Sequence, residues 1–241
     1  MKHRKLKIAL WIIAGVIIFF VADFFIFVGG YYRADNVAIE AMETADVEIR
    51  TGDGYIAYVP EGAETGIIFY PGGKVEHTAY APLMLELADK GFACILVEMP
   101  YNLAVFDINA ADGLQSVLPE VEHWYIGGHS LGGAMAASYV SKHESEYDGL
   151  ILLAAYSTSD LSDTDLEVIS VYGENDGVMK MGKHDKCLEN LPDDTVEEVI
   201  EGGCHAYFGS YGRQDGDGIP TITNARQIEE AADIIAQNIA A

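Results

Sequence analysis

The sequence predicts an α/β fold, a mostly parallel central sheet with helices on both faces, preceded by one N-terminal transmembrane helix. After about residue 35, short apolar runs alternate with longer stretches of helical periodicity, the pattern of strands joined by crossover helices. Half of the 241 residues are hydrophobic, enough for one well-buried core but cramped for two domains. We therefore expect an N-terminal membrane anchor, residues 1–35, and one globular domain, residues 36–241.

The N-terminal segment has the features of a membrane anchor. Four basic residues lie within residues 2–7, and the apolar run 8–30 contains a single ionisable group, Asp23. At about 1.5 Å per residue, a helix of this length crosses a hydrocarbon core of about 30 Å. The basic flank favours a cytoplasmic N-terminus and an extracytoplasmic domain. The alternative is a cleaved signal peptide and a secreted domain, but bulky residues follow Asp23 and no Ala-x-Ala site closes the run.

The formal charge of -24 is concentrated in the globular part. Beyond residue 35 there are 9 basic and 36 acidic residues, a formal charge of -27. Phosphate backbones repel such a surface, so nucleic acid is not expected as a partner. The simplest interpretation of the charge is solubility.

The strands and helices of the globular part are expected in a regular order. A turn at residues 51–54 indicates an opening hairpin of strands 47–50 and 55–59. The remaining apolar runs predict strands at 66–70, 93–98, 123–127, 149–155, 166–172 and 195–200, and the remaining helical stretches predict helices at 79–90, 106–118, 130–142 and 227–240. Only about ten polar residues separate the strands near 155 and 166, so we expect no lid domain.

A Gly-x-Ser-x-Gly pentapeptide spans residues 128–132 and places Ser130 at its centre. Alone, this pattern is weak, because a glycine-rich chain produces it by chance and an ordinary turn explains it. Here it lies between an apolar run and a helix rich in small residues, where a sharp strand-to-helix turn exposes the serine hydroxyl. We interpret Ser130 as a nucleophile.

A serine hydroxyl becomes a nucleophile only beside a base, which a carboxylate in turn orients. Asp176 follows the strand predicted at 166–172, at the edge where this architecture places catalytic groups, and Glu174 is the alternative acid. His205 lies in a glycine-rich loop after the last predicted strand. His77 precedes Ser130 in the chain, and the remaining histidines lie before the membrane segment, at the start of a strand, inside the pentapeptide or on expected solvent-facing helix positions: His3, His123, His129, His143 and His184.

Acyl transfer also requires N–H donors for the developing oxyanion. The N–H of Leu131, the residue after the nucleophile, is one candidate, and Gly73, in the loop after strand 66–70, is the other, with Lys74 as its alternative. Lys74, Met99 and Tyr101 are candidate substrate-pocket residues, although ordinary loop packing explains the last two equally well.

The three cysteines have no metal-site spacing, so no metal is expected. Cys94 lies in an apolar strand and is expected in the core. Cys187 and Cys204 flank a predicted strand and are a possible disulfide in an oxidising compartment, with free thiols as the alternative.

Four motifs in this order resemble the α/β-hydrolase family, specifically its compact lid-less members similar to dienelactone hydrolases and esterases: residues 70–75, 128–133, 173–176 and 203–208. The resemblance implies hydrolysis of an ester, thioester or amide through an acyl-enzyme, with no cofactor required. Two features depart from the pattern. Pro71 replaces the histidine of the commoner His-Gly oxyanion motif, and the nucleophile is serine rather than the cysteine of true dienelactone hydrolases, so dienelactone is not the expected substrate.

The leading hypothesis is a membrane-tethered, outward-facing carboxylic-ester hydrolase that acts on a small-molecule ester or acyl substrate with Ser130, His205 and Asp176. A serine peptidase or an acyltransferase would use the same chemistry. A catalytically silent binding domain is the alternative from another class, and it would be free to lose residues that this sequence retains. The sequence indicates no particular oligomeric state.

Overall fold

The computed structural model describes residues 2–239 and divides the chain into two compact units, Met1–Tyr31 and Tyr32–Ala241. This division falls slightly before the predicted boundary at residues 35 and 36. The reason is that Tyr32 already belongs to the second unit, where its N–H donates to the carbonyl of Lys74 at 2.8 Å.

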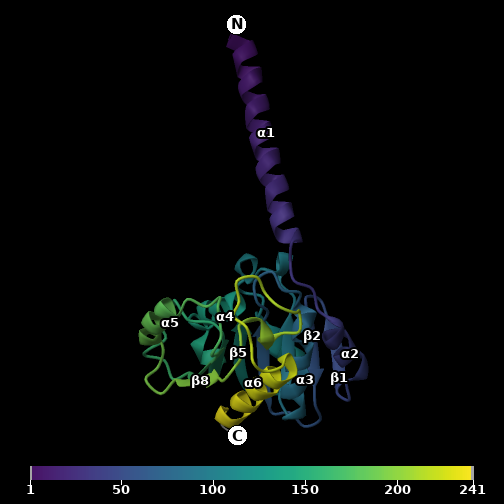
Figure 1. The fold of residues 1–241 in the computed structure, drawn as a ribbon, viewed down its shortest axis with the longest axis vertical. Coiled ribbons are helices and arrows are strands. Elements are labelled where there is room, and N and C mark those ends of the chain that lie inside the picture. Colours follow the sequence, from purple (N-terminus) through teal and green to yellow (C-terminus); the bar gives the residue numbers. More distant parts are fainter. Residues whose placement is uncertain (1, 240–241) are drawn as a thin grey trace. The chain divides into compact units, whose positions relative to one another are not determined.

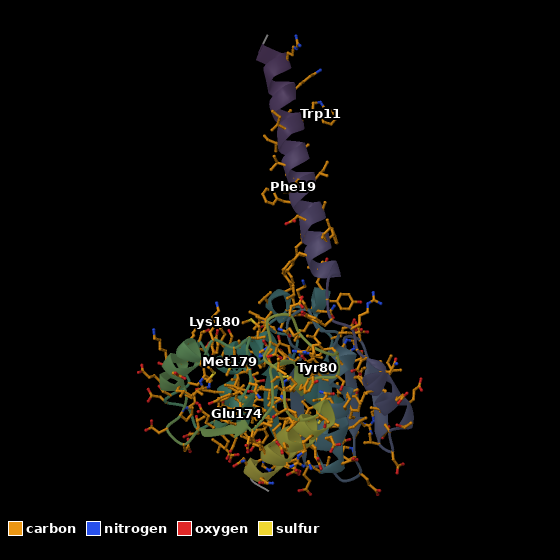
Figure 2. All side chains as sticks on the ribbon, in the orientation of Figure 1. Trp11, Phe19, Tyr80, Glu174, Met179 and Lys180 are labelled. Atoms are coloured by element: carbon orange, nitrogen blue, oxygen red, sulfur yellow. The ribbon has the colours of Figure 1, made fainter. Side chains whose placement is uncertain are left out.

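The first unit is a single helix, α1 (Lys2–Gly29). Its segment Leu10–Gly29 has a mean hydropathy of 2.7 and is long and apolar enough to cross a membrane. Large apolar side chains of α1 are exposed, and Figure 2 shows two of them, Trp11 and Phe19, pointing outward. A signal sequence near an N-terminus has the same features.

The second unit is built on an eight-stranded sheet with the order β1-β2-β4-β3-β5-β6-β7-β8. The strands are β1 (Glu48–Gly52), β2 (Tyr55–Val59), β3 (Thr65–Tyr70), β4 (Ala93–Val97), β5 (His123–His129), β6 (Gly149–Leu153), β7 (Glu167–Gly173) and β8 (Val196–Ile200). The pairs β1–β2 and β2–β4 are antiparallel, and all other pairs are parallel. The predicted mostly parallel sheet with its opening hairpin is confirmed.

Helices cover both faces of the sheet, as predicted (Figure 1). One core cluster holds buried residues of α3 (Ala81–Asp89) and α6 (Asn224–Asn238), and the other holds those of α4 (Leu131–Val140). The central strands serve both clusters because their side chains alternate. In β3, for example, Ile67 and Phe69 face the first cluster, and Ile68 and Tyr70 face the second.

The site is positioned by the strand order around β3. This strand lies between β4 and β5, so the chain leaves β3 on one side and later returns on the other. In open α/β sheets, the crevice outside the carboxyl ends of two such strands is where ligands bind. The loop after Tyr70 and the turn after His129 therefore border the expected ligand site.

One predicted helix, residues 106–118, is wrong. This stretch forms turns and two short 3-10 segments, η3 (Ala104–Phe106) and η4 (Leu114–Val117). The Tyr70 hydroxyl holds the chain in this path, because it donates to the carbonyl of Ile108 and accepts the N–H of Ala111, both at 2.9 Å. Gly113 has a φ of 75°, which also ends any helix.

Two short helices were not predicted. Helix α2 (Asn36–Thr44) is capped by Asp35, whose carboxylate accepts two N–H groups of its first turn, and α5 (Met181–Cys187) follows β7. Between β6 and β7 the chain forms only bends and turns, so no lid covers this edge of the described chain.

Candidate active site

Ser130 occupies a sharp turn between β5 and α4. Its backbone angles, φ 53° and ψ -120°, are rare for a residue with a side chain and cost about 1–3 kcal/mol. The surrounding elements hold it there: the Ser130 N–H donates to the carbonyl of Leu153 at 2.9 Å, and its carbonyl accepts the N–H of Ala134 at 3.1 Å. The strained turn leaves Ser130 partly exposed at the carboxyl edge of the sheet.

Two glycines allow the turn to lie directly against the loop after β3. A Cβ on Gly132 would collide with the carbonyl oxygens of Tyr70 and Pro71. A Cβ on Gly128 would lie 2.5 Å from the same Tyr70 oxygen. The spacing of the pentapeptide is therefore explained by backbone contact on both sides of Ser130.

The structure brings the three residues predicted to act together within hydrogen-bonding distance. His205 Nε2 lies 2.9 Å from Ser130 Oγ, and His205 Nδ1 lies 2.7 Å from Asp176 Oδ2. The side chains of His205 and Asp176 are 2% and 1% exposed. The alternative acid, Glu174, instead accepts the N–H of Gly202 at 2.9 Å.

The surroundings of Asp176 determine the proton positions. Its Oδ1 accepts the N–H groups of Val178 and Met179, both at 2.8 Å, so Oδ2 is directed at His205. A carboxylate is an acceptor, so Nδ1 of the imidazole carries the proton of the shared bond. The lone pair of Nε2 then faces the hydroxyl of Ser130 and can accept its proton.

Two backbone N–H groups near Ser130 have the positions expected of oxyanion donors. Leu131 is the first residue of α4, where an N–H has no partner within the helix. Gly73 approaches it closely, since a Cβ on Gly73 would lie 2.8 Å from Leu131 Cδ2. The N–H groups on either side are already used: that of Gly72 donates to Tyr80 Oη at 2.9 Å and that of Lys74 donates to Asn102 at 2.7 Å.

Among residues 2–239, neither the Gly73 N–H nor the Leu131 N–H has an acceptor. The geometry thus favours Gly73 over its alternative, Lys74, whose N–H is engaged.

A family model described as the alpha/beta hydrolase family matches residues 66–229, about two thirds of the chain. The chain belongs to the α/β-hydrolase family. This match contains the turn at Ser130, the loop after β7 that holds Asp176 (the acid loop) and the loop after β8 that holds His205 (the histidine loop).

One curated relative matches a shorter part of the chain. The AB hydrolase superfamily protein YisY of Bacillus subtilis (strain 168) is 33% identical over 100 residues, which cover 37% of this chain and 37% of that protein. The match thus spans little more than a third of the relative's length.

Solved structures share the fold. A dienelactone hydrolase from Anabaena variabilis has a TM-score of 0.58 at 14% identity, covering 77% of this chain and 92% of that one. Est1E from Butyrivibrio proteoclasticus has a TM-score of 0.56 at 15% identity, covering 81% and 99%.

A buried pair, Tyr80 and His129, supports the loop after β3 and was not predicted. Tyr80 Oη accepts the Gly72 N–H and lies 2.7 Å from His129 Nδ1, to which it donates. Burial lowers the pKa of His129 well below its ordinary value, and the nearby His205 lowers it further. His129 is therefore neutral, so no second positive charge lies beside His205, whose ring centroid is 4.6 Å away. Only the fold reveals this pair, because Tyr80 and His129 lie on separate elements.

Asp217 is a further residue that the sequence does not reveal. Its carboxylate joins the acid loop to the histidine loop: Oδ1 accepts the N–H groups of Gly177 and His205, both at 3.1 Å, and Oδ2 accepts that of Ala206 at 2.9 Å. Oδ1 also accepts the N–H of Gly218 at 2.7 Å. It acts mainly on backbone N–H groups, a role that no side-chain motif could have revealed.

Burial alone would raise the pKa of Asp217, but the N–H groups of the two loops outweigh it and hold the pKa below its ordinary value. The folded chain therefore binds this proton more weakly than the unfolded chain. The stabilisation is complete above the ordinary aspartate pKa of about 4 and is lost as the pH falls through the lower folded value.

We expect Asp217→Asn to lower kcat by about 10²-fold, because one of the two loops shifts when an NH₂ group faces a backbone N–H. Its melting temperature should lie furthest below wild type at neutral pH, and the difference should shrink toward pH 3. Asp215→Asn, an exposed change in the same loop, is the matched control. A constant difference from pH 7 to pH 3 would show that the charge of Asp217 has no role.

A pocket of about 420 Å³ opens beside Ser130. It is lined by the start of α4, the loop after β6, the loop after β7 and His205. Lys74, Met99 and Tyr101, the predicted pocket residues, do not line it. Met99 is instead buried in the second core cluster, and the Tyr101 ring packs on Phe106 with centroids 5.8 Å apart.

Of the two alternatives for Cys187 and Cys204, the structure has free thiols and not the disulfide, and all three cysteines are buried. Cys204 packs in the first core cluster, where Gln227 bonds both its N–H and its carbonyl, whereas Cys187 ends α5 outside that cluster. Burial raises the pKa of Cys204 to about 12, so its thiol stays protonated.

His184, expected to face solvent, is 2% exposed and packs on Tyr172.

Proposed function

We propose that this hydrolase is a serine carboxylesterase in which Ser130 is the nucleophile, His205 the general base and acid, and Asp176 the orienting carboxylate. The observation that supports this most strongly is the continuous chain of contacts from Asp176 Oδ2 through His205 to Ser130 Oγ, at 2.7 and 2.9 Å. Nucleophile, base and orienting group are thus ordered as acyl transfer requires.

In the first half of the reaction, Ser130 Oγ attacks the ester carbonyl carbon while His205 Nε2 takes the hydroxyl proton. The imidazolium that forms is stabilised by Asp176, which is desolvated and faces it directly. The carbonyl oxygen becomes negatively charged and accepts the N–H groups of Gly73 and Leu131, each worth about 3 kcal/mol in such a site. The C–O bond then breaks, and the leaving alcohol takes the proton from His205.

In the second half, a water molecule enters from the open pocket. His205 removes a proton from this water, whose oxygen attacks the acyl carbon. The same two N–H groups stabilise the second oxyanion, and the bond to Ser130 Oγ breaks as His205 returns the proton to it. The products are a carboxylic acid and an alcohol, and every proton is supplied and returned by His205, so the cycle needs no cofactor.

We also propose that α1 remains uncleaved and anchors the enzyme with its globular unit outside the cytoplasm. The apolar segment Leu10–Gly29 and the basic residues before it support this orientation. The full chain should stay with membranes in alkaline carbonate, and protease added to intact cells should digest the globular unit. Recovery of a shortened, soluble protein from the medium would contradict the anchor.

The enzymatic proposal is tested with a fluorophosphonate probe and a panel of p-nitrophenyl esters, applied to the full chain and to Ser130→Ala. Labelling and ester turnover should both depend on Ser130. A folded protein that is neither labelled nor active would favour the silent binding domain. Labelling accompanied only by peptide cleavage, or only by acyl transfer to an added alcohol, would replace the esterase with the peptidase or the acyltransferase.

A further inference from the structure

The pocket beside Ser130 differs in charge from the rest of the molecule. Its charged lining residues are Lys180 and Lys183, and no aspartate or glutamate of the described chain lines it. By contrast, each of four other surface hollows is lined by at least three carboxylates. This contrast is marked in a chain that has 38 acidic and 14 basic residues. The local positive charge is therefore a property of this pocket and not of the surface in general.

The two lysines sit where α5 begins, after the acid loop. Lys180 is the N-cap residue of α5, and Figure 2 shows it together with Met179, another lining residue. Lys183 Nζ lies 5.0 Å from the centroid of the Tyr156 ring, which also lines the pocket. This cation–π contact holds the ammonium group at the pocket wall.

Neither lysine is neutralised by a carboxylate in the described part of the chain. The acidic groups closest to them in sequence have other partners: Asp176 bonds His205 and two N–H groups, and Asp185 lies 3.3 Å from His184. Two positive charges with no counter-ion thus face a pocket that also contains Ser130 and His205.

We propose that Lys180 and Lys183 bind the carboxylate of an anionic ester whose reacting carbonyl lies at Ser130. This inference rests on the proposed esterase function. The pocket lining also includes Met135, Val178 and Met179, whose apolar side chains suit a short hydrocarbon link between the ester and the carboxylate.

A single carboxylate fits this site better than a doubly charged phosphate. The negatively charged chain repels every additional negative charge, while the two ammonium groups attract the anion only at short range. The two lysines would offset this repulsion only once the substrate is close to the pocket.

The test compares mono-p-nitrophenyl adipate, which carries a carboxylate, with neutral p-nitrophenyl hexanoate, which has the same chain length and the same leaving group. The readout is the ratio of kcat/KM for the two esters, in which effects on folding and on the shared chemistry cancel. We expect this ratio to fall about five-fold in Lys180→Gln and in Lys183→Gln, and further in the double variant. Added sodium chloride should lower the ratio in wild type but not in the double variant, where only the repulsion from the acidic chain is left to be screened.

Lys186→Gln is the matched control, because this substitution removes the same charge from the same helix. Lys186 is exposed and does not line the pocket. It should change the ratio less than about two-fold, since its charge does not face the pocket in which the substrate would bind. An equal fall in this control, or an unchanged ratio in the double variant, would overturn the lysine assignment.

The two proposals fail in different ways. If p-nitrophenyl hexanoate is hydrolysed and the probe labels Ser130, but the ratio of kcat/KM is the same in wild type and in the lysine variants, only the anionic-substrate inference is wrong. If neither ester is cleaved and the folded protein is not labelled, the esterase itself is wrong.

Discussion

Ser130→Ala is expected to lower kcat for a p-nitrophenyl ester by about 10⁵-fold while the protein stays folded. Without Oγ no acyl-enzyme forms, and only binding and the Gly73 and Leu131 donors remain to assist water. The fold should tolerate the change, because alanine is smaller and, within residues 2–239, Ser130 Oγ bonds only His205. The measurement is steady-state ester hydrolysis, together with a thermal melt of both proteins.

Ser138→Ala is the matched control, because Ser138 lies on α4 and does not line the pocket. It should keep wild-type kcat. If Ser130→Ala retained activity within about ten-fold of wild type in a preparation free of other esterases, the assignment of Ser130 as nucleophile would be wrong, since such a residual rate exceeds non-covalent assistance.

Asp176→Asn is expected to lower kcat by about 10⁴-fold with little change in structure. The N–H groups of Val178 and Met179 donate to Oδ1, so they would keep the amide oxygen of the new side chain at that position. The amide NH₂ would then face His205 Nδ1 as a donor. This forces the imidazole proton onto Nε2, and Nε2 can then no longer accept the proton of Ser130.

The pH profile of this variant and a paired substitution test the explanation. Glu174→Gln, at the alternative acid, should retain wild-type kcat because an amide oxygen can still accept the Gly202 N–H. In Asp176→Asn, activity should rise at high pH, where hydroxide can replace the missing base. If kcat fell further in Glu174→Gln than in Asp176→Asn, the assignment of Asp176 as the orienting carboxylate would be wrong.

Most strands could be predicted because the inner ones are short apolar runs with side chains buried on both faces of the sheet, whereas the edge strands β1 and β8 are largely exposed. Where the prediction failed, tertiary contacts override local preference. Residues 106–118 have apolar positions at helical spacing, but the Tyr70 hydroxyl bonds their backbone at Ile108 and Ala111. Helix α5 formed where no helix was predicted, because its short, polar, glycine-containing sequence has no periodic apolar face.

The residues predicted to act together could be found because each follows a strand of the parallel sheet, and the carboxyl ends of those strands meet at one edge. Asp217 and Tyr80 could not, since both act on backbone N–H groups that only the fold brings within reach. The sequence also predicts pocket residues at this edge, Lys74 after β3 and Met99 and Tyr101 after β4, with ordinary loop packing as the alternative for the last two. Which of several loops at the same edge leaves a hollow depends on packing, and the hollow lies after β6 and β7.

In the proposed mechanism, Ser130 carries the acyl group during turnover. The most direct measurement mixes the full chain with excess p-nitrophenyl ester, quenches the reaction in acid within the first turnover, and maps the peptides by mass spectrometry. We predict a burst of p-nitrophenol equal to the enzyme concentration and the added acyl mass on the peptide containing Ser130, both absent in Ser130→Ala. Steady turnover with no acylated peptide, or with the acyl group on another residue, would contradict the claim.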